Sequence, residues 1–446
     1  MAYQKRKIDA ALEEWRRRKG HKPLVVKGAR QTGKTESIRH FAASAYGNVV
    51  YINFVERPEF AGIVSEGYSV EAVVRNISQV DGRFRFEPNQ TLIVFDEIQE
   101  CPDVATAFKF FALDGRYDVV ASGSLLGIHW KKIHSVSVGF QETIEMKSMD
   151  FEEFLWAQGR DGAYVEELLE QMVDGRAFPE TTMEAAGRHF LHHCITGGMP
   201  AVVEQFARTG NFSGLAEMQR EIVRAYRGDC GKYCEGLDAA KIRAVFASVP
   251  GQLARENKKF QYAQIGRNAR AREYGGCVEW LVDAGILSKC RRMKFPELPI
   301  RGNLDEDAFK LYVSDTGLLL AMLDEESAAD FRVNRNFGTY RGGIAENIAA
   351  EAYAKAGKEL AYYKREDSTL EEDFFLRTAK SLVPVEVKAT RGTSKSLRTL
   401  IESKRYPDIR FGVKLHGGNT GIGKGIYTFP WFCAFLVPRF LSVLGK

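Results

Sequence analysis

The segment from Gly28 to Thr35, GARQTGKT, constrains the fold of this chain more than any other feature of the sequence. It fits the pattern G-x-x-x-x-G-K-[ST], whose glycines let the backbone wrap tightly so that successive N–H groups point at phosphate oxygens. The helix after such a loop directs its positive end at the same phosphates. The apolar stretch PLVVKG leads into the loop, and a helical pattern follows it to Ala45. The sequence therefore predicts a buried strand, a phosphate-binding loop and a helix, in that order.

Each position of this loop has an expected role in binding ATP. Lys34 would supply a positive charge to the β- and γ-phosphates, and the Thr35 hydroxyl would ligate Mg²⁺. The other members would surround the phosphates with their backbone: Gly28, Ala29, Arg30, Gln31, Thr32 and Gly33. ATP and Mg²⁺ are therefore the expected cofactors.

A second acidic strand end supports this interpretation. The stretch TLIVFDEIQE runs through four apolar residues to Asp96 and Glu97. We expect Asp96 to hold magnesium through water, and Glu97 to orient or deprotonate the attacking water. A solvated pair of carboxylates is the alternative. Ser122 and Ser124 end the next predicted strand, YDVVASGS, and are candidate sensors of the γ-phosphate, with a plain turn as the alternative.

Strands alternate with helices over residues 1–160. Apolar stretches at 49–54, 91–97 and 117–124 add to the strand before the loop. This alternation predicts a parallel α/β sheet with right-handed crossovers. We therefore expect a P-loop ATPase domain over residues 1–160.

The chain has 446 residues, which is too many for one hydrophobic core, so several domains are expected. Sequence patterns divide the part after residue 160 into three. Residues 161–235 are helical, with a sharp break at GGMP (197–200), and indicate a helical lid. Residues 236–335 contain two helices followed by a basic strand, SKCRRMKF, which is the order of a winged helix. Residues 336–446 return to an α/β pattern.

Several long strings resemble one family. They are LVVKGARQTGKT, LIVFDEIQ, SGSLLGI, VGFQETIEMKSMDFEEFLWAQG, GGMP, YGGCVEWLVDAGIL, FKLYVSDTGLL, GGIAEN and VPVEVKAT. Together they resemble bacterial and archaeal AAA-like ATPases whose C-terminal domain of unknown function is similar to PD-(D/E)XK nucleases. The resemblance implies an active ATPase with a restriction-endonuclease-like domain over residues 336–446. It also implies that Pro200 packs near the adenine, as in the Gly-x-Pro element of related ATPases; a helix–helix turn is the alternative.

Four residues of the C-terminal part form a candidate nuclease-like set. Asp373 opens the strand DFFLRT, and Glu386 and Lys388 lie two residues apart in VPVEVKAT, so they face the same side of a strand. Two carboxylates can share a magnesium ion while a lysine activates water, and Glu346 on the preceding helix would add a ligand. The family's aliphatic position is Glu372 here. An ion pair on a strand is the alternative for Glu386 and Lys388.

The charge of the chain permits contact with nucleic acid without arguing for it. The net charge is +5, from 63 basic and 58 acidic residues, so any argument must come from local patches. Arg267, Arg270 and Arg272 near Tyr274 form a candidate DNA face on the winged-helix segment. A solvated helix face is the alternative.

Cysteine spacing and hydropathy argue against a zinc-binding, disulfide-rich, secreted or membrane-spanning protein. The seven cysteines form no C-x-x-C pair, which argues against a zinc site or a disulfide framework. The N-terminal stretch lacks an apolar run of signal-peptide length, and no stretch reaches about 18 apolar residues. We therefore expect a cytoplasmic protein without membrane contact.

The leading hypothesis is an ATP-driven molecular switch that acts on DNA through the winged-helix and nuclease-like domains. A signalling or scaffold ATPase that binds a protein partner, with a catalytically inactive C-terminal domain, is the first alternative. A nucleotide-binding protein with little turnover is the second. The sequence leaves open whether the chain forms a homo-oligomer.

Overall fold

The computed structural model describes residues 3–124, 139–232, 236–324, 326–333, 335, 340–389 and 392–445. Most of the string SGSLLGI therefore lies outside the described residues. Contacts within the chain divide it into two compact units. The first comprises Met1–Ser148 with Asp283–Gly285, and the second comprises Met149–Val282 with Ile286–Lys446.

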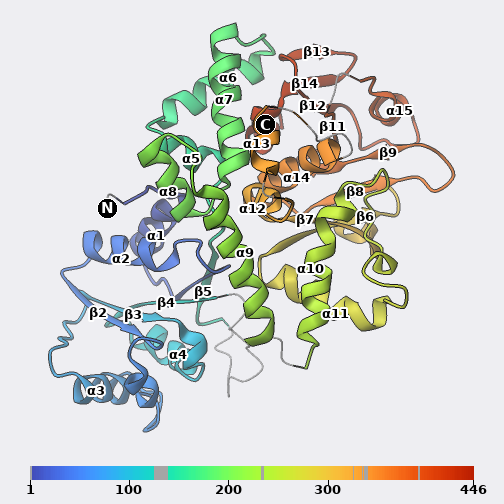
Figure 1. Ribbon diagram of the computed structural model, residues 1–446. Helices are drawn as coiled ribbons and strands as arrows, with labels where there is room; N and C mark the ends of the chain where they lie inside the picture. Colours follow the sequence, from blue (N-terminus) through green and yellow to red (C-terminus); the bar gives the residue numbers. More distant parts are fainter. Residues whose placement is uncertain are drawn as a thin grey trace. The chain divides into compact units, whose positions relative to one another are not determined.

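A five-stranded sheet forms the centre of the first unit, in the order β2-β3-β4-β1-β5 (Figure 1). All of its pairings are parallel, as the alternation of strands and helices predicted. The strands are β1 (Leu24–Gly28), β2 (Asn48–Asn53), β3 (Thr91–Asp96), β4 (Asp118–Ser124) and β5 (Glu142–Glu145). Every residue of β3 is buried, which is typical of a parallel strand covered on both faces.

Helices cover both faces of this sheet. They are α1 (Lys7–Arg17), α2 (Lys34–Ala45), α3 (Val70–Val80) and α4 (Val104–Asp114), with short 3₁₀ turns η1 (Pro58–Gly62) and η2 (Ile98–Glu100). Side chains of α3 and α4 pack with Val25 of β1 in one core, and those of α1 and α2 pack with Leu24 and Val26 in another. The alternation of a strand thus divides β1 between two cores.

The strand β5 was not expected from the sequence. Its residues, ETIE, alternate between half-buried and exposed positions at the edge of the sheet. An edge strand needs only one apolar face, so a stretch this short and polar gives little signal.

Helices make up much of the second unit. They are α5 (Phe151–Ala157), α6 (Gly162–Asp174), α7 (Glu180–Thr196), α8 (Pro200–Thr209), α9 (Leu215–Lys232), α10 (Ala239–Leu253), α11 (Ala271–Asp283), α12 (Thr316–Ala321), α13 (Ser327–Arg332), α14 (Tyr340–Lys355), α15 (Lys395–Glu402) and α16 (Val437–Leu444). Several begin at aspartates whose carboxylates accept backbone N–H bonds, as Asp150, Asp161 and Asp238 do. None of the helices in the described ranges is both long and apolar enough to cross a membrane.

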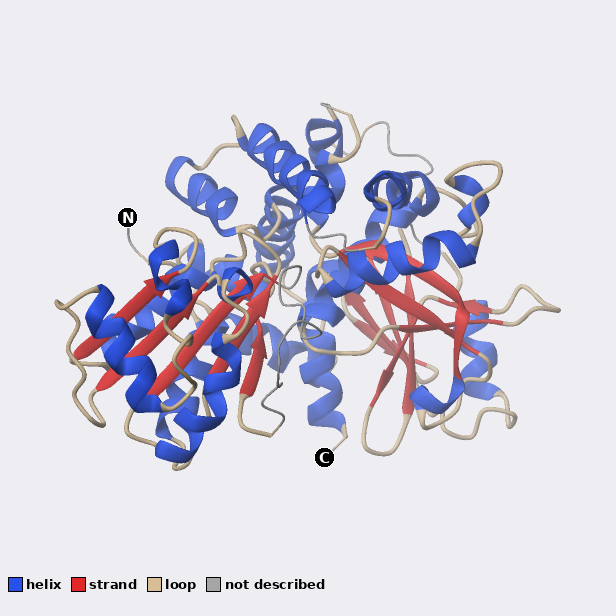
Figure 2. Ribbon diagram, turned by 90° about the horizontal axis from the view of Figure 1, so that it is seen from below, coloured by secondary structure: helices blue, strands red, loops and turns tan. Residues whose placement is uncertain are grey.

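Two sheets complete the second unit (Figure 2). One has the order β7-β6-β8-β9 and the other β10-β11-β12-β14-β13. The strands are β6 (Leu287–Met293), β7 (Leu304–Val313), β8 (Ala361–Lys364), β9 (Glu371–Glu372), β10 (Phe374–Arg377), β11 (Leu382–Val387), β12 (Gly412–His416), β13 (Gly421–Gly423) and β14 (Ile426–Pro430). The 3₁₀ turns are η4 (Tyr262–Gln264), η5 (Ile300–Asn303) and η6 (Trp431–Leu436).

The two sheets meet in sequence at Asp373, the single residue between β9 and β10. The strand β8 pairs antiparallel with β9, and β10 pairs antiparallel with β11. The strand β11 then pairs parallel with β12, after the crossover through α15. The hairpin of β6 and β7 is not a separate wing, because β6 also pairs parallel with β8.

Candidate functional site

The backbone of the predicted phosphate loop is tightly wound. It leaves β1 at Gly28 and enters α2 at Lys34, and both Gln31 and Gly33 have positive φ, of 63° and 91°. A side chain at Gly28 would overlap the carbonyl oxygen of Met146, the residue just after β5. The glycine is therefore required by the close approach of two neighbouring strand ends.

The Lys34 ammonium is held by this loop. Its Nζ donates to the carbonyl oxygens of Gly28 at 3.0 Å and Ala29 at 2.8 Å. Burial lowers the pKa of Lys34 to about 8, while the charges of Glu97 and Asp96 oppose that shift. A buried cation without a bound anion is costly, so phosphate oxygens would be favourable partners for it.

Arg6 supports the loop and was not identified from the sequence. Its side chain is 5% exposed and donates to the carbonyl oxygens of Thr32 and Lys147, each at 2.8 Å. Thr32 Oγ1 in turn donates to the Ala29 carbonyl at 2.9 Å. Arg6 lies in a basic N-terminal stretch, which in sequence looks like an ordinary solvated helix start.

The Asp96 carboxylate is the best-connected side chain of the site. Its Oδ2 accepts hydrogen bonds from Thr35 Oγ1 at 3.1 Å, from Asn53 Nδ2 at 3.3 Å and from the Tyr51 hydroxyl. Its Oδ1 accepts from the Ser122 hydroxyl and, at 3.1 Å, from the Glu97 backbone N–H. Residues from α2, β2 and β4 thus converge on the end of β3. Tyr51 and Asn53 were not identified from the sequence, although both lie on the adjacent strand.

Glu97 stands in a strained turn beside Asp96. Its φ is 57°, a left-handed conformation that non-glycine residues adopt at a cost. Gln99 donates to Glu97 Oε2 from the following turn η2. The conformation turns the chain sharply after β3, and the glutamine fixes one oxygen of the carboxylate.

The two serines predicted to sense phosphate have different surroundings. The Ser122 hydroxyl donates to Asp96 and so belongs to the carboxylate's environment. Ser124 is 2% exposed, and its hydroxyl has no hydrogen-bond partner among the described residues. An unpaired buried hydroxyl is unfavourable, which makes Ser124 the more natural candidate for contact with a ligand.

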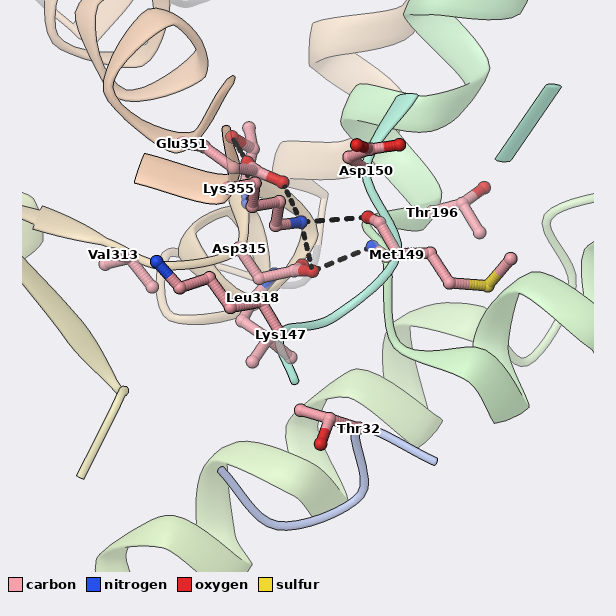
Figure 3. Close-up of polar contacts among 12 residues, drawn as sticks. Thr32, Lys147, Met149, Asp150, Thr196, Val313, Asp315, Leu318, Glu351 and Lys355 are labelled. Carbon is pink, nitrogen blue, oxygen red and sulfur yellow. Dashed lines mark hydrogen bonds and ion pairs between the residues drawn. The ribbon is translucent and has the colours of Figure 1, made fainter. Parts of the chain in front are cut away.

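The GGMP element lies in the second unit, within a buried polar network (Figure 3). The Gly198 N–H donates to Asp315 Oδ2 at 2.7 Å, and its carbonyl accepts from the Met149 N–H at 2.7 Å. Lys355 Nζ donates to the Met149 carbonyl at 2.9 Å and to Glu351 Oε1 at 2.6 Å. Pro200 begins α8, where proline is favoured because its missing N–H is not needed. Its contact with adenine stays a prediction.

The C-terminal candidate set forms two ion-paired groups that adjoin at Asp373, whose Oδ2 accepts from the N–H of Val387, the residue between Glu386 and Lys388. Glu386 Oε1 pairs with Lys388 Nζ at 2.8 Å, whereas Glu346 and Asp373 lie near another lysine, Lys310. Burial and the nearby Glu346 charge raise the pKa of Asp373 to about 7. Among the described residues, no three acidic, imidazole or thiol side chains form a group that could hold a metal ion.

Three parts of the chain match models of known families. Residues 20–155 match the model of an AAA domain. Residues 187–329 and 341–433 match two domains of unknown function, DUF8612 and DUF4143. No curated protein matches the chain. The first match covers the part of the chain that forms the parallel sheet and the loop, and it supports an AAA-like P-loop fold for the first unit.

Solved structures resemble the chain only distantly. A Walker-type ATPase of Pyrococcus abyssi is 14% identical, with 72% of this chain and 96% of that chain covered and a TM-score of 0.41. The Thermotoga maritima RuvB Holliday junction branch migration motor is 13% identical, with coverages of 74% and 93% and a TM-score of 0.28. Drosophila ORC bound to DNA is 13% identical, with coverages of 68% and 90% and a TM-score of 0.27. At such TM-scores these likenesses add nothing to the AAA-domain match.

Proposed function

We propose that this chain is an ATP-hydrolysing molecular switch. The observation that carries the proposal is the hydrogen bond of 3.1 Å between Thr35 Oγ1 and Asp96 Oδ2. A hydroxyl after the P-loop lysine and a carboxylate at the end of a second strand of the same sheet are the two side chains that hold Mg²⁺ in P-loop ATPases. Their proximity fits a shared ion, with Thr35 as a ligand and Asp96 acting through water. The ion would supply positive charge to the β- and γ-phosphates.

The remaining residues would perform the other tasks of hydrolysis. Lys34 would turn from the carbonyls of its own loop to the phosphates, whose charge stabilises its protonated form. Glu97 would accept a hydrogen bond from the attacking water, with Gln99 fixing the orientation of the carboxylate. Ser124 would donate its hydroxyl to the γ-phosphate.

Phosphate release and nucleotide binding test this assignment. We expect Lys34→Ala to weaken ATP binding, and Glu97→Gln to keep binding while losing hydrolysis by about 100-fold or more. Glu100→Gln makes the same chemical change three residues further along and should leave turnover intact. Equal turnover in wild type, Lys34→Ala and Glu97→Gln would refute the site.

We also propose that the switch acts on nucleic acid through residues 236–335 and 336–446. Support comes from the chain order of α10, α11 and the antiparallel pair β6–β7, which is the order of a winged helix even though β6 also pairs with β8. Arg267, Arg270 and Arg272 are exposed at the start of α11, where basic side chains and helix N–H groups can meet phosphates.

Anisotropy of labelled DNA at several salt concentrations tests this second proposal. Replacing the three arginines by glutamine should weaken binding and reduce its salt dependence. Replacing Arg17, Lys19 and Arg85 in the first unit removes the same charge and should have little effect. Absence of binding to single- or double-stranded DNA or RNA at low salt, with and without ATP, would refute the proposal.

The order of elements in the C-terminal part supports a nuclease-like core. The helix α14 carries Glu346, the junction of β9 and β10 carries Asp373, and Glu386 lies in β11 with Lys388 just after it. This is the order of helix acid, strand acid and E-x-K.

One observation favours the alternative of a scaffold ATPase with an inactive C-terminal domain. Glu386 and Lys388 form an ion pair of 2.8 Å, as the structural interpretation of E-x-K predicted. A protein partner whose capture requires Lys34 and survives Glu386→Ala would support this alternative over action on DNA.

A further inference from the structure

A buried lysine lies among the acids of the nuclease-like set. Lys310 comes from β7, and its side chain is 1% exposed. Its Nζ lies 3.3 Å from Glu346 Oε2, 3.2 Å from Glu371 Oε1 and 3.9 Å from Asp373 Oδ1. The ring of Tyr362 lies against the same ammonium, with its centroid 4.8 Å away. The ammonium is therefore enclosed by carboxylates and an aromatic ring.

The carboxylate oxygens of Glu346 and Asp373 already have partners from the protein, whereas Glu386 Oε2 is buried without a hydrogen-bond partner among the described residues. Lys258 Nζ lies 2.9 Å from Glu346 Oε1, and the Tyr312 hydroxyl donates to Glu346 Oε2 at 2.9 Å. The Val387 N–H donates to Asp373 Oδ2 at 2.8 Å. All four oxygens of Glu346 and Asp373 are thus accounted for by these donors and Lys310.

The two lysines come from a different part of the chain than the acids. Lys258 follows α10 and Lys310 lies on β7, both within the winged-helix segment, whereas the acids lie on α14 and around β9. A lysine has donors and no acceptor, so it cannot ligate a metal, and its charge repels a divalent cation from its neighbourhood. A magnesium ion between Glu346 and Asp373 does not fit this donor set.

We propose that Lys310, assisted by Lys258, takes the place of a divalent cation between Glu346 and Asp373. Glu346 and Asp373, called the acid set below, then form with the two lysines a charged contact that joins the nuclease-like part to the winged-helix segment, and no divalent cation binds between these two carboxylates. A buried charge cluster of this kind holds together only while both signs are present. The inference goes beyond the proposed ATPase and does not depend on it.

Titration of the full-length, nucleotide-free protein with Mn²⁺ tests the proposal directly. Asp96→Asn serves as the parental background, because it removes the carboxylate of the P-loop site. We expect the parental protein and its Glu346→Gln derivative to give the same titration, followed by electron paramagnetic resonance of free Mn²⁺. One equivalent of Mn²⁺ that the parental protein binds and the Glu346→Gln derivative loses would overturn the proposal.

Substitution of Lys310 provides a second test of the proposal. In the same background, Lys310→Met should lower the melting temperature by several degrees, gain a Mn²⁺ site and recover stability when Mn²⁺ is added. Lys289→Met is the matched control, because Lys289 on β6 is 5% exposed and pairs with Glu279 at 2.6 Å, outside the acid set. It should gain no Mn²⁺ site.

Two further outcomes are decisive for the lysine variant. A folded Lys310→Met protein with the parental Mn²⁺ titration would contradict the proposal. If this variant does not fold, the double variant Lys310→Met/Glu346→Gln should fold better, because it loses one charge of each sign. A double variant no more stable than Lys310→Met would also count against it.

Discussion

At the scale of residues, Asp96 shows how hydrogen bonds within the chain order the candidate nucleotide site. A buried carboxylate is costly unless hydrogen bonds replace its water, and here Thr35, Tyr51, Asn53 and Ser122 provide them. These donors fix the position of the carboxylate relative to the loop. In the proposed ATPase, this site would need little reorganisation to receive Mg²⁺.

The buried ammonium of Lys34 predicts a pH dependence of nucleotide binding. Its pKa of about 8 means that the ammonium proposed to meet the phosphates loses its proton in the nucleotide-free protein as the pH rises through this value. We expect the dissociation constant of ATP to rise about tenfold from pH 7 to pH 9, measured by fluorescence with a labelled nucleotide. Lys34→Met should bind weakly without this pH dependence. The same slope in that variant would assign it to another group.

The lowered pKa of Lys34 affects folding stability and ATP binding in opposite directions. Raising the pH should weaken ATP binding and stabilise the nucleotide-free fold. The unfolded chain keeps the ordinary lysine pKa of 10.5, so it binds more protons than the folded chain between about pH 8 and 10.5. Lys34 therefore makes the nucleotide-free fold more stable as the pH rises through this window.

At the scale of elements, α14 is organised by polar contacts rather than by an apolar stripe. Asn347 accepts from the Val313 N–H at 2.8 Å and donates to the Val313 carbonyl at 3.1 Å. Glu351 accepts from the Thr316 N–H at 2.7 Å. Because the helix is buried around much of its surface, these bonds replace water for the start of α12 and the end of β7.

The close contact between GGMP and the start of α5 gives a prediction at this scale. A side chain at Gly198 would overlap the Met149 backbone, so Gly198→Ala should destabilise the second unit by about 2 kcal/mol or more. Gly187→Ala, at a half-buried position within α7 with no atom close to its Cβ position, should instead stabilise it by about 0.5–1 kcal/mol. Urea unfolding of both variants measures the difference, and equal effects would contradict the packing described here.

At the scale of the whole molecule, the chain contains separate cores. Two cores flank the parallel sheet of the first unit, and a further core packs around Met293, Tyr363 and Phe375 in the second. The candidate nucleotide-binding residues from Gly28 to Ser124 all belong to the first unit, whereas the GGMP element and the acid set belong to the second.

This division predicts the thermal response to nucleotide. Because a ligand stabilises the unit that binds it, we expect calorimetry to show two transitions, of which Mg²⁺–ATP raises one. Lys34→Ala should abolish that shift and leave both transitions in place. A single transition that moves as a whole with nucleotide would show instead that the units unfold together.

The sequence by itself determined the features that depend on residues close together along the chain, namely the phosphate-binding loop and the acidic strand end. Gly28–Thr35 specifies a loop between a strand and a helix, and the apolar stretch before Asp96 specifies a buried strand with an acidic end, because both depend on local backbone geometry and burial. The parallel α/β sheet followed from the same alternation.

Only the tertiary structure decided which distant residues complete each site. Arg6 reaches the loop from the N-terminal segment, and Ser122 turns to Asp96. Lys310 lies beside Glu346 and Asp373, two carboxylates that the sequence predicted to bind a metal ion. Such contacts depend on how strands and helices pack, and no local pattern records them. The same charged side chain can be a solvated residue or a buried counter-ion, and burial beside other charges makes the difference.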